Sequence, residues 1–356
     1  MANLFSPITF RNIELKNRIV VSPMCQYSSE DGFANDWHFV HLGSRAVGGA
    51  ALVMAEASAV SPEGRISAAD LGIWKDEHIE PLKKITRFIH QQNAHAGIQL
   101  AHAGRKASHT EPWNGNVQVG ITKGGWQAVA PSALAFSSGD ELPVALTPEE
   151  INQIVADFKA AAKRAHQAGF TVIEIHAAHG YLINAFLSPL SNQRTDEYGG
   201  EFNNRIRFLL QIIAAVREEW PNGYPLFVRI SASDWIKEGW TIRDSVALAA
   251  ILKTKGVDLV DCSSGGIVPN LPIPAAPGYQ VQFAEAIRRE TGMPTAAVGI
   301  IITPLQAEEI IASEKADLVL LAREFLRDPY FPLRAARELE YDTKWPVQYE
   351  RARRKA

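Results

Sequence analysis

The sequence predicts an α/β protein folded as a single (β/α)8 TIM barrel, with loop excursions over the C-terminal face of the barrel. Eight short runs rich in Val, Ile and Leu each precede a longer stretch with helical patterning. No long linker or low-complexity tract interrupts this alternation across the 356 residues. Alternating strands and helices favour a parallel sheet, and eight such units suit one closed barrel. We therefore expect residues 1–356 to form one domain.

The predicted strands are short β-rich runs, as expected for strands covered on both faces. They span residues 19–21, 51–54, 97–100, 172–176, 226–230, 257–262, 295–298 and 317–321. The helix between Thr147 and Gly169 has the most complete local signals. Thr147 suits the N-cap, Pro148 the first helical position and Glu150 the third, while Gly169 suits the residue after the end.

Two segments interrupt the alternation. Residues 103–146, rich in Gly, Pro and Trp, follow the third strand, and we expect them to form an excursion over the barrel mouth. Residues 265–278 follow the sixth strand and contain four prolines. This second segment is either a further wall of the site or only a stiff surface loop.

Composition and charge exclude several classes of protein. The chain is 46% hydrophobic and 21% charged with a net charge of -3, and its basic C-terminal residues form a short tail, which argues against a nucleic-acid partner. Two cysteines, Cys25 and Cys262, do not suggest a disulfide framework and favour a reducing compartment. No export signal or apolar run of about 18 residues stands out. We expect a cytoplasmic protein that does not enter membranes.

One apolar run, at 171–181, ends in two imidazoles and a phenol. Because the C-terminal ends of barrel strands face the active site, His176, His179 and Tyr181 are expected to share one small volume. Neutral imidazoles can donate hydrogen bonds to a substrate oxygen, and a phenol can supply a proton. A single histidine would be explained as a polar residue closing a strand, but the three groups together favour catalysis.

Unusual residues also collect at the other strand ends. They are Ser22, Pro23, Met24, Cys25, Tyr27, Ala57, Gln99, His102, Arg229, Ser263, Gly299 and Arg323. Singly, several have structural explanations, such as shaping a turn, but their joint placement favours a cofactor site. Gly299 and Arg323 follow strands seven and eight, where such barrels commonly hold phosphate. Alternatively, Arg323 bridges to Glu324 or Asp328.

Five motifs in the same order resemble the old yellow enzyme family of FMN-dependent ene reductases. They are SPMCQY (22–27), IQLAHAGRK (98–106), HAAHGY (176–181), SNQRTDEYGG (191–200) and VRIS (228–231). The similarity runs from about Leu4 into the C-terminal tail. Cys25 and Tyr27 resemble the bacterial branch that contains xenobiotic reductases and thermophile-type ene reductases. The resemblance implies FMN as cofactor and NADPH or NADH as the hydride donor.

The resemblance also assigns a role to each matching residue. Tyr181 is the proton donor, His176 and His179 bind the activating oxygen of the substrate, and Tyr27 lines the pocket. The residues implied to surround the flavin ring are Ser22, Pro23, Met24, Cys25, Ala57, Gln99 and Arg229. Those implied to reach the ribityl phosphate are Ser263, Gly299, Ala322 and Arg323. Ala322 departs from the glycine that is common in the family, and its methyl group would crowd a backbone contact to phosphate.

These roles imply the reduction of an activated alkene, such as an α,β-unsaturated carbonyl or nitro compound. Hydride from flavin N5 would add to the β-carbon, and Tyr181 would protonate the α-carbon. Arg229 would stabilise the negative charge of the reduced flavin. Cys25 is expected to tune the flavin rather than act as a nucleophile, with a small buried apolar side chain as the alternative.

The C-terminal tail, residues 341–356, carries a further expectation. The resemblance places Arg354 near the position of an arginine that inserts into the active site of the adjoining subunit, although this tail departs from the aromatic-containing version. Insertion predicts a homodimer or a homotetramer, whereas a frayed tail is the alternative.

Two other functions fit parts of the sequence. A metal-dependent TIM-barrel hydrolase could use His102, His176 and His179 as ligands, but the neighbouring strand ends carry an amide, a guanidinium and serines where carboxylates are usual. A non-catalytic flavin-binding protein would not need Tyr181 and both histidines. The sequence therefore favours an ene reductase without a metal.

Overall fold

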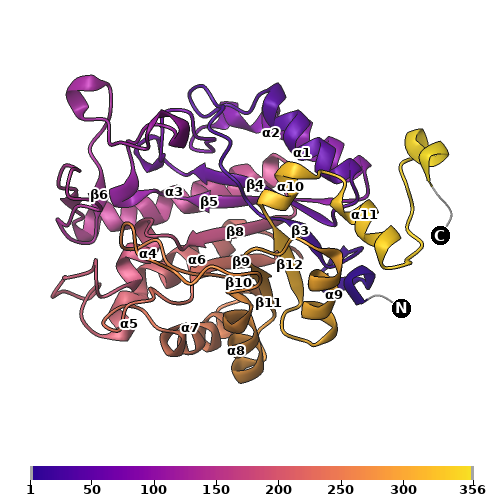
Figure 1. Ribbon diagram of the computed structural model, residues 1–356. Coiled ribbons are helices and arrows are strands. Elements are labelled where there is room, and N and C mark those ends of the chain that lie inside the picture. The colour runs from indigo at the N-terminus through magenta and orange to yellow at the C-terminus, as the bar shows by residue number, and fades with distance from the viewer. Residues whose placement is uncertain (1–2, 354–356) are drawn as a thin grey trace.

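The computed structural model describes residues 3–353, in which eight parallel strands close into a barrel (Figure 1). In order around the barrel they are β3 (Ile19–Val21), β4 (Leu52–Ala59), β5 (His95–Ala101), β8 (Val172–Ala177), β9 (Leu226–Ser231), β10 (Leu259–Ser263), β11 (Thr295–Val298) and β12 (Leu318–Leu321). Strand β12 pairs with β3 and so closes the cylinder. The predicted (β/α)8 barrel is confirmed, and each predicted strand is present, although β4 continues to Ala59 rather than ending at Met54.

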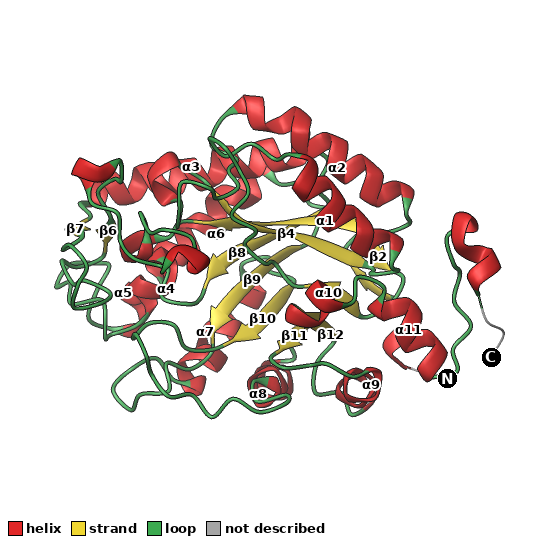
Figure 2. Cartoon of the chain, turned by 45° about the horizontal axis from the view of Figure 1, so that its top comes forward, coloured by secondary structure: helices red, strands yellow, loops and turns green. Residues whose placement is uncertain are grey.

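Helices cover the outside of the barrel on all sides (Figure 2). The longer ones are α1 (Asp36–Val47), α2 (Ile79–Gln91), α3 (Pro148–Gln167), α6 (Arg207–Glu219), α7 (Ile242–Thr254), α8 (Val281–Thr291), α9 (Pro304–Ala312) and α11 (Phe331–Glu338). Shorter helices occur in the connections, namely α4 (Leu182–Leu187), α5 (Phe202–Arg205) and α10 (Arg323–Arg327). None of the helices in residues 3–353 has the length and apolar character needed to cross a membrane.

The predicted capping of α3 is confirmed. Thr147 Oγ1 accepts from the backbone N–H of Glu150 at 3.2 Å, and the Glu150 carboxylate accepts from the N–H of Thr147 at 2.8 Å. Gly169, one residue beyond the C-cap, takes φ +83°, a conformation that glycine adopts without steric cost. Both ends of this helix are therefore set by local hydrogen bonding and backbone conformation.

The end of the barrel that faces away from the strand C-termini is closed by apolar side chains. A hairpin of β1 (Ile8–Phe10) and β2 (Ile13–Leu15) packs Phe10, Ile13 and Leu15 against inward-facing strand residues. Those residues are Val20, Leu52, Met54, Val172, Phe227, Leu259, Ala296, Val298, Leu318 and Leu320. Because successive strand residues alternate between the two faces, the intervening residues pack against the helices instead.

Both excursions reach the barrel mouth. Residues 103–146 carry a small parallel pair, β6 (Val129–Ala130) and β7 (Val144–Ala145), and several short 3-10 turns. Ala103, Ala107 and Ala128 of this excursion cluster with Ile66, and Tyr27, Cys25, Trp126 and Tyr181 pack against the cluster. In the second excursion a Cβ at Gly266 would lie 2.6 Å from His179 Cα. Residues 265–267 therefore form a wall of the site, while 269–277 are half-buried or exposed.

We predict that Phe10→Ala destabilises the protein by about 3–5 kcal/mol, because it opens a cavity in the closed end of the barrel. Phe10 is 5% exposed and its ring lies edge-on to Phe227, with centroids 5.4 Å apart. Urea unfolding measures the change. Thr9→Ala, on the exposed side of the same strand, is the matched control and should change stability by less than about 0.5 kcal/mol. Equal effects of the two substitutions would contradict the role of Phe10 as a plug.

Candidate active site

Every barrel strand brings predicted site residues to the same end of the barrel. Ser22, Pro23, Met24, Cys25 and Tyr27 follow β3, Ala57 lies on β4, and Gln99 lies on β5. His176 lies on β8, with His179 and Tyr181 just beyond it, and Arg229 and Ser263 lie on β9 and β10. Gly299 follows β11, and Ala322 and Arg323 follow β12. The C-terminal Arg354 lies outside the described residues.

The two histidines and the tyrosine after β8 form one cluster. The His176 ring lies perpendicular to those of His179 and Tyr181, with centroids 5.1 and 4.9 Å away. His176 Nδ1 accepts from the backbone N–H of Ala178 at 3.3 Å. In the neutral ring the proton is then on Nε2, which makes Nε2–H the available donor. The prediction that these three side chains share one small volume is confirmed.

His179 is held in a conformation that few side chains adopt. Its φ of +61° lies in the left-handed region, which is unfavourable for residues other than glycine. Its backbone N–H donates to Ser231 Oγ at 2.9 Å, and its Nε2 lies 2.7 Å from Ser263 Oγ. Ser263, which the resemblance places beside the cofactor, thus also fixes the His179 ring.

Burial and nearby positive charge keep both imidazoles neutral. Burial, followed by Arg229 and Lys106, lowers the pKa of His176 well below 6.5, and the pKa of His179 falls for the same reasons with a further contribution from His176. Lys106 had no role in the sequence interpretation, although it ends one of the five motifs. Its Nζ donates to the carbonyl of His179 at 3.0 Å and lies 5.2 Å from the centre of the Tyr181 ring.

The environment of Cys25 favours a neutral thiol. Burial, followed by the carboxyl groups of Asp70 and Glu56, raises the pKa of Cys25 well above its ordinary value. Glu56 accepts from the backbone N–H of Gln26 at 2.8 Å, and so fixes the loop that carries the thiol. Burial also raises the pKa of the adjacent Tyr27 phenol. A protonated thiol between two acids fits the expectation that Cys25 is not a nucleophile.

Gly299 and Ala322 bring backbone groups to the ends of β11 and β12. Gly299 has φ +124°, and a Cβ there would lie 2.9 Å from Gln280 Nε2 and 3.0 Å from Tyr279 Cε1. Glycine is therefore required at this position by both conformation and space. Ala322 has φ -108° and ψ -91°, so its φ lies outside the left-handed region that favours glycine.

Arg323 does not bridge to the neighbouring acids, which was the alternative considered for it. Glu324 pairs with Arg327 and Arg334, and Asp328 also pairs with Arg334. Arg323 itself is exposed and forms no ion pair with another residue of the described range 3–353. Its guanidinium therefore remains available to an anionic ligand.

Two carboxyl groups lie beneath the mouth, where none was predicted. Gln99 Nε2 donates to Glu174 Oε1 at 2.8 Å, and Arg229 Nε lies 3.0 Å from Asp261 Oδ2. The sequence interpretation placed an amide, a guanidinium and serines at these strand ends and missed the two acids, although Glu174 is opposite Gln99 and Asp261 is opposite Arg229 in the sheet. A signal was present, because Glu174 precedes His176 by two residues and so faces the same side of the strand.

The metal-ligand cluster needed for the hydrolase alternative is not found in the described part of the chain. Residues 3–353 contain no group of three or more His, Cys, Asp or Glu side chains that could hold a metal ion. His102 is instead engaged in a turn, where its Nδ1 accepts from the backbone N–H of Gly104 at 3.0 Å.

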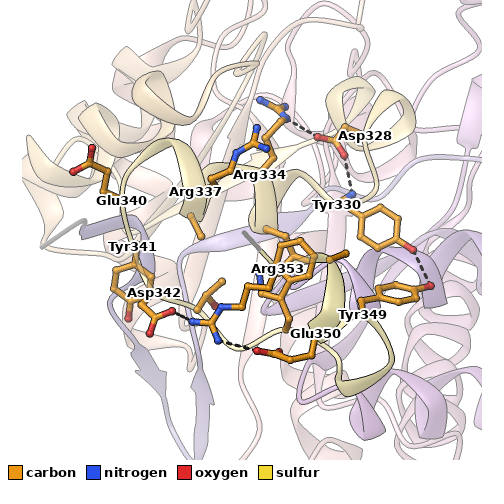
Figure 3. A pocket seen from close by; sticks show the side chains of 15 residues that line it. Asp328, Tyr330, Arg334, Arg337, Glu340, Tyr341, Asp342, Tyr349, Glu350 and Arg353 are labelled. Atoms are coloured by element: carbon orange, nitrogen blue, oxygen red, sulfur yellow. Dashed lines mark hydrogen bonds and ion pairs between the residues drawn. The ribbon is translucent and has the colours of Figure 1, made fainter. Parts of the chain in front are cut away.

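A groove lies between α11 and the C-terminal arm, which we define as residues 341–353 (Figure 3). The arm includes the short helix η7 (Val347–Ala352). Arg353 pairs with Asp342 and, at 3.1 Å, with Glu350, so the arm is closed on itself by charge. Tyr349 of the arm faces Tyr330 of the body, with hydroxyl oxygens 3.5 Å apart.

Sequence comparison extends over nearly the whole chain. Residues 3–342 match the NADH:flavin oxidoreductase / NADH oxidase family. An NADPH dehydrogenase of Bacillus cytotoxicus is 53% identical over 352 residues, which are 98% of this chain and 96% of that protein. An NADPH dehydrogenase of a Geobacillus species is 52% identical over 350 residues, 98% of each chain.

Solved structures with the same barrel are also similar. Morphinone reductase in complex with tetrahydroNAD superposes with a TM-score of 0.79 at 27% identity, over 96% of this chain and 92% of that one. A 2-naphthoyl-CoA reductase gives a TM-score of 0.86 at 27% identity over 94% of this chain. The match spans about half of that longer protein, 52% of its chain.

We predict that the buried histidines make the protein less stable in acid. Because the pKa values of His176 and His179 are lowered on folding, the unfolded chain binds more protons than the folded chain below about pH 6.5. Stability should therefore fall as the pH falls from about 6.5 toward 4. The double variant His176→Asn, His179→Asn should show a shallower fall in urea-unfolding experiments. His166→Asn, at an exposed position, should keep the wild-type slope.

Proposed function

This chain belongs to the NADH:flavin oxidoreductase / NADH oxidase family, that of the old yellow enzymes, and we propose that it is an FMN-dependent NADPH dehydrogenase that reduces activated alkenes. The substrates would be α,β-unsaturated carbonyl or nitro compounds. One observation carries the proposal: the cluster of His176, His179 and Tyr181 lies at the same end of the barrel as Arg229 and Gly299. Two relatives that are NADPH dehydrogenases support NADPH as the donor.

The donor groups at the mouth fit FMN. Arg229 contacts Asp261 through Nε and Ser22 through Nη1, which leaves further N–H groups of its five for the acceptors of a flavin ring. Gln99 uses one amide N–H on Glu174 and keeps its carbonyl oxygen and its second N–H. Gly299 and the unpaired guanidinium of Arg323 suit a phosphate. When bound, FMN would take a hydride from NADPH and deliver it to an electron-poor carbon.

The imidazoles would bind the oxygen of the substrate. His176 Nε2–H is a donor whose ring is fixed by Ala178, and it can polarise a carbonyl or nitro group. For His179 to donate as well, its proton must be on Nδ1 while Nε2 accepts from Ser263. Both rings are neutral, so their donated hydrogen bonds strengthen as negative charge develops on the substrate oxygen.

Tyr181 would hold the proton that completes the reduction. Burial raises the pKa of its phenol well above 10, so the proton stays in place until a basic carbon is presented. The phenolate left after transfer needs stabilisation, and the Lys106 ammonium above the ring can provide it. The excursion 103–146, packed against Tyr181, keeps water from this step.

We predict that Tyr181→Phe slows substrate reduction by about 10²- to 10⁴-fold, because phenylalanine keeps the ring packing but carries no proton. FMN binding and reduction by NADPH should continue. Anaerobic stopped-flow measurements follow flavin bleaching by NADPH and its recovery with an enone, a maleimide or a nitroalkene.

Two results would reject the proposed chemistry. The first is wild-type protein that binds FMN and is bleached by NADPH, yet recovers with none of these alkenes. The second is a Tyr181→Phe variant that recovers as fast as wild type.

We further propose a cytoplasmic homodimer or homotetramer in which the C-terminal arm contacts the neighbouring subunit. The arm and the β6–β7 pair of the mouth excursion lie at opposite sides of the molecule in two views (Figures 1 and 2), so an arm of this length is badly placed to cover its own site. Val347 on the arm is 83% exposed, which supports a buried partner contact. Both cysteines are free, as suits a reducing compartment.

We predict that removing residues 351–356, and with them Arg354, raises the KM for alkene by about tenfold with a smaller change in kcat, because the neighbouring site loses a binding group. Steady-state kinetics measure the effect, and sedimentation velocity measures assembly. Val347→Ser, which keeps the tail, should weaken assembly without removing Arg354. Unchanged kinetics and an unchanged oligomer in the truncated chain would remove the proposed contact.

A further inference from the structure

Four polar side chains, those of Gln99, Glu174, Asp261 and Arg229, form a row across the barrel interior between the apolar plug and the mouth. Gln99 donates to Glu174 at 2.8 Å, the carboxyl groups of Glu174 and Asp261 are within hydrogen-bonding reach, and Arg229 Nε lies 3.0 Å from Asp261 Oδ2. Glu174 is 1% and Asp261 0% exposed. In the register of the sheet, Gln99 is opposite Glu174, and Arg229 is opposite Asp261. Strand pairing therefore sets the Gln99–Glu174 and Arg229–Asp261 contacts, whereas the contact between Glu174 and Asp261 joins β8 and β10, which are separated by β9.

This row of four side chains lacks one hydrogen-bond donor. Neither carboxylate oxygen of Asp261 has a hydrogen-bond partner of good geometry among residues 3–353, even though Arg229 Nε is near. A buried acceptor without a donor costs about 1–3 kcal/mol, and more when it is charged. If Glu174 carries a proton, its O–H supplies the missing donor to Asp261. Its carbonyl oxygen still accepts from Gln99.

The charges lead to the same conclusion. With both acids ionised, two negative charges would share the single positive charge of Arg229 in a buried site, which is unfavourable. One retained proton makes the group neutral. Burial and then Asp261 raise the pKa of Glu174 to about 8, and burial raises the pKa of Asp261 to about 6. Arg229 Nε lies against Asp261 and so favours its ionised form, which assigns the shared proton to Glu174 at neutral pH.

The surrounding strands do not alter this balance. The inward residues that β3, β4, β11 and β12 place along the barrel interior are uncharged, namely Val20, Ser22, Met54, Ala296, Val298, Leu318 and Leu320. On β8 the next inward residue is His176, which is neutral, and on β10 the neighbouring thiol of Cys262 is kept protonated by its raised pKa. Within the described residues, Arg229 is the cation of this layer.

We propose that Glu174 and Asp261 are positioning residues that share one proton, and that this proton holds Gln99 and Arg229 in the orientations that bind FMN. The pair acts through its neighbours, because each acid contacts a predicted flavin-site residue of the same layer, Glu174 through Gln99 and Asp261 through Arg229. Glu174 fixes which way the Gln99 amide faces, and Asp261 fixes the guanidinium. The flavin part of this inference rests on the proposed function, whereas the shared proton does not.

The first experiment tests the shared proton in apoprotein. Between about pH 4.5 and 8 the unfolded chain loses the Glu174 proton while the folded chain retains it, so this residue lowers stability as the pH rises. Glu174→Gln mimics the protonated acid, since its amide can accept from Gln99 and donate to Asp261. Its stability relative to wild type should therefore increase steadily from pH 5 to pH 8 in urea unfolding. A constant difference would overturn the proposal.

Infrared spectroscopy tests the same proton directly. Wild-type apoprotein at pH 7 should show a carbonyl band of a buried protonated carboxyl group that is lost in Glu174→Gln. Asp261→Asn should lose it as well, because Glu174 then becomes the counter-ion of Arg229 and ionises. Asp234→Asn changes an acid that is also 0% exposed but lies outside the pair, and it should keep the band. Burial raises the pKa of Asp70 to about 7, so its carboxyl contributes to every spectrum and the band is followed in difference spectra against wild type. No loss of intensity in either pair variant would contradict proton sharing.

The second experiment tests positioning, with FMN as the probe in fluorescence titrations. Above about pH 8 the wild-type pair loses its proton and places an added negative charge beneath the flavin, so the Kd for FMN should rise about tenfold between pH 7 and pH 9. Burial lowers the pKa of Lys106 to about 8, so loss of this charge contributes equally in all variants. Glu174→Gln should bind as wild type at pH 7 and show a clearly smaller rise, while Asp234→Asn should show the full rise.

The two experiments separate this inference from the function that it builds on. A parallel rise in wild type and Glu174→Gln would overturn the positioning role. If FMN fails to bind wild-type protein at any pH, the proposed function fails, but the stability and infrared results still decide whether the proton is shared.

Discussion

The ion pair between Arg229 and Asp261 is the interaction on which the site depends. A guanidinium can occupy the interior of a closed barrel only if a nearby negative charge offsets the cost of removing it from water. Asp261 on β10 supplies that negative charge, and the strand register places Glu174 opposite Gln99. The barrel interior therefore contains an apolar plug and a polar middle layer, and the remaining candidate cofactor residues lie at the C-terminal ends of the strands.

The positive charge in this layer also sets the chemistry above it. Arg229 and Lys106 help burial to keep His176 and His179 neutral, so the two rings can act as hydrogen-bond donors rather than as cations. Tyr181 keeps its proton because its phenol is buried near groups that would repel a phenolate. Burial thus gives three titratable side chains a fixed protonation state near neutral pH, and the fold supplies that burial through the 103–146 excursion.

The parts that were predictable are those with local causes. The capping of α3 by Thr147 and Glu150 follows from neighbouring residues, and apolar runs identified each barrel strand. The placement of His176 followed from a rule about strand ends. The carboxyl pair was missed because an acid inside an apolar run gives no sign of its partner, which lies on another strand. The sequence also could not decide whether Arg323 pairs with Glu324 or Asp328. Both acids pair instead with Arg334 on α11, which is known only from the structure.

By itself, the sequence determined the barrel fold, the end of the barrel that carries the candidate site, and the family. It could do so because strand patterns and long motifs consist of residues that are consecutive in the chain. The tertiary structure alone decided which side chains share a proton, which tautomer His176 carries and where the C-terminal arm lies. These properties depend on distances between residues that are far apart in the chain. Burial is the physical reason for the difference: it shifts the free energy of each charge, and it exists only after the strands have closed.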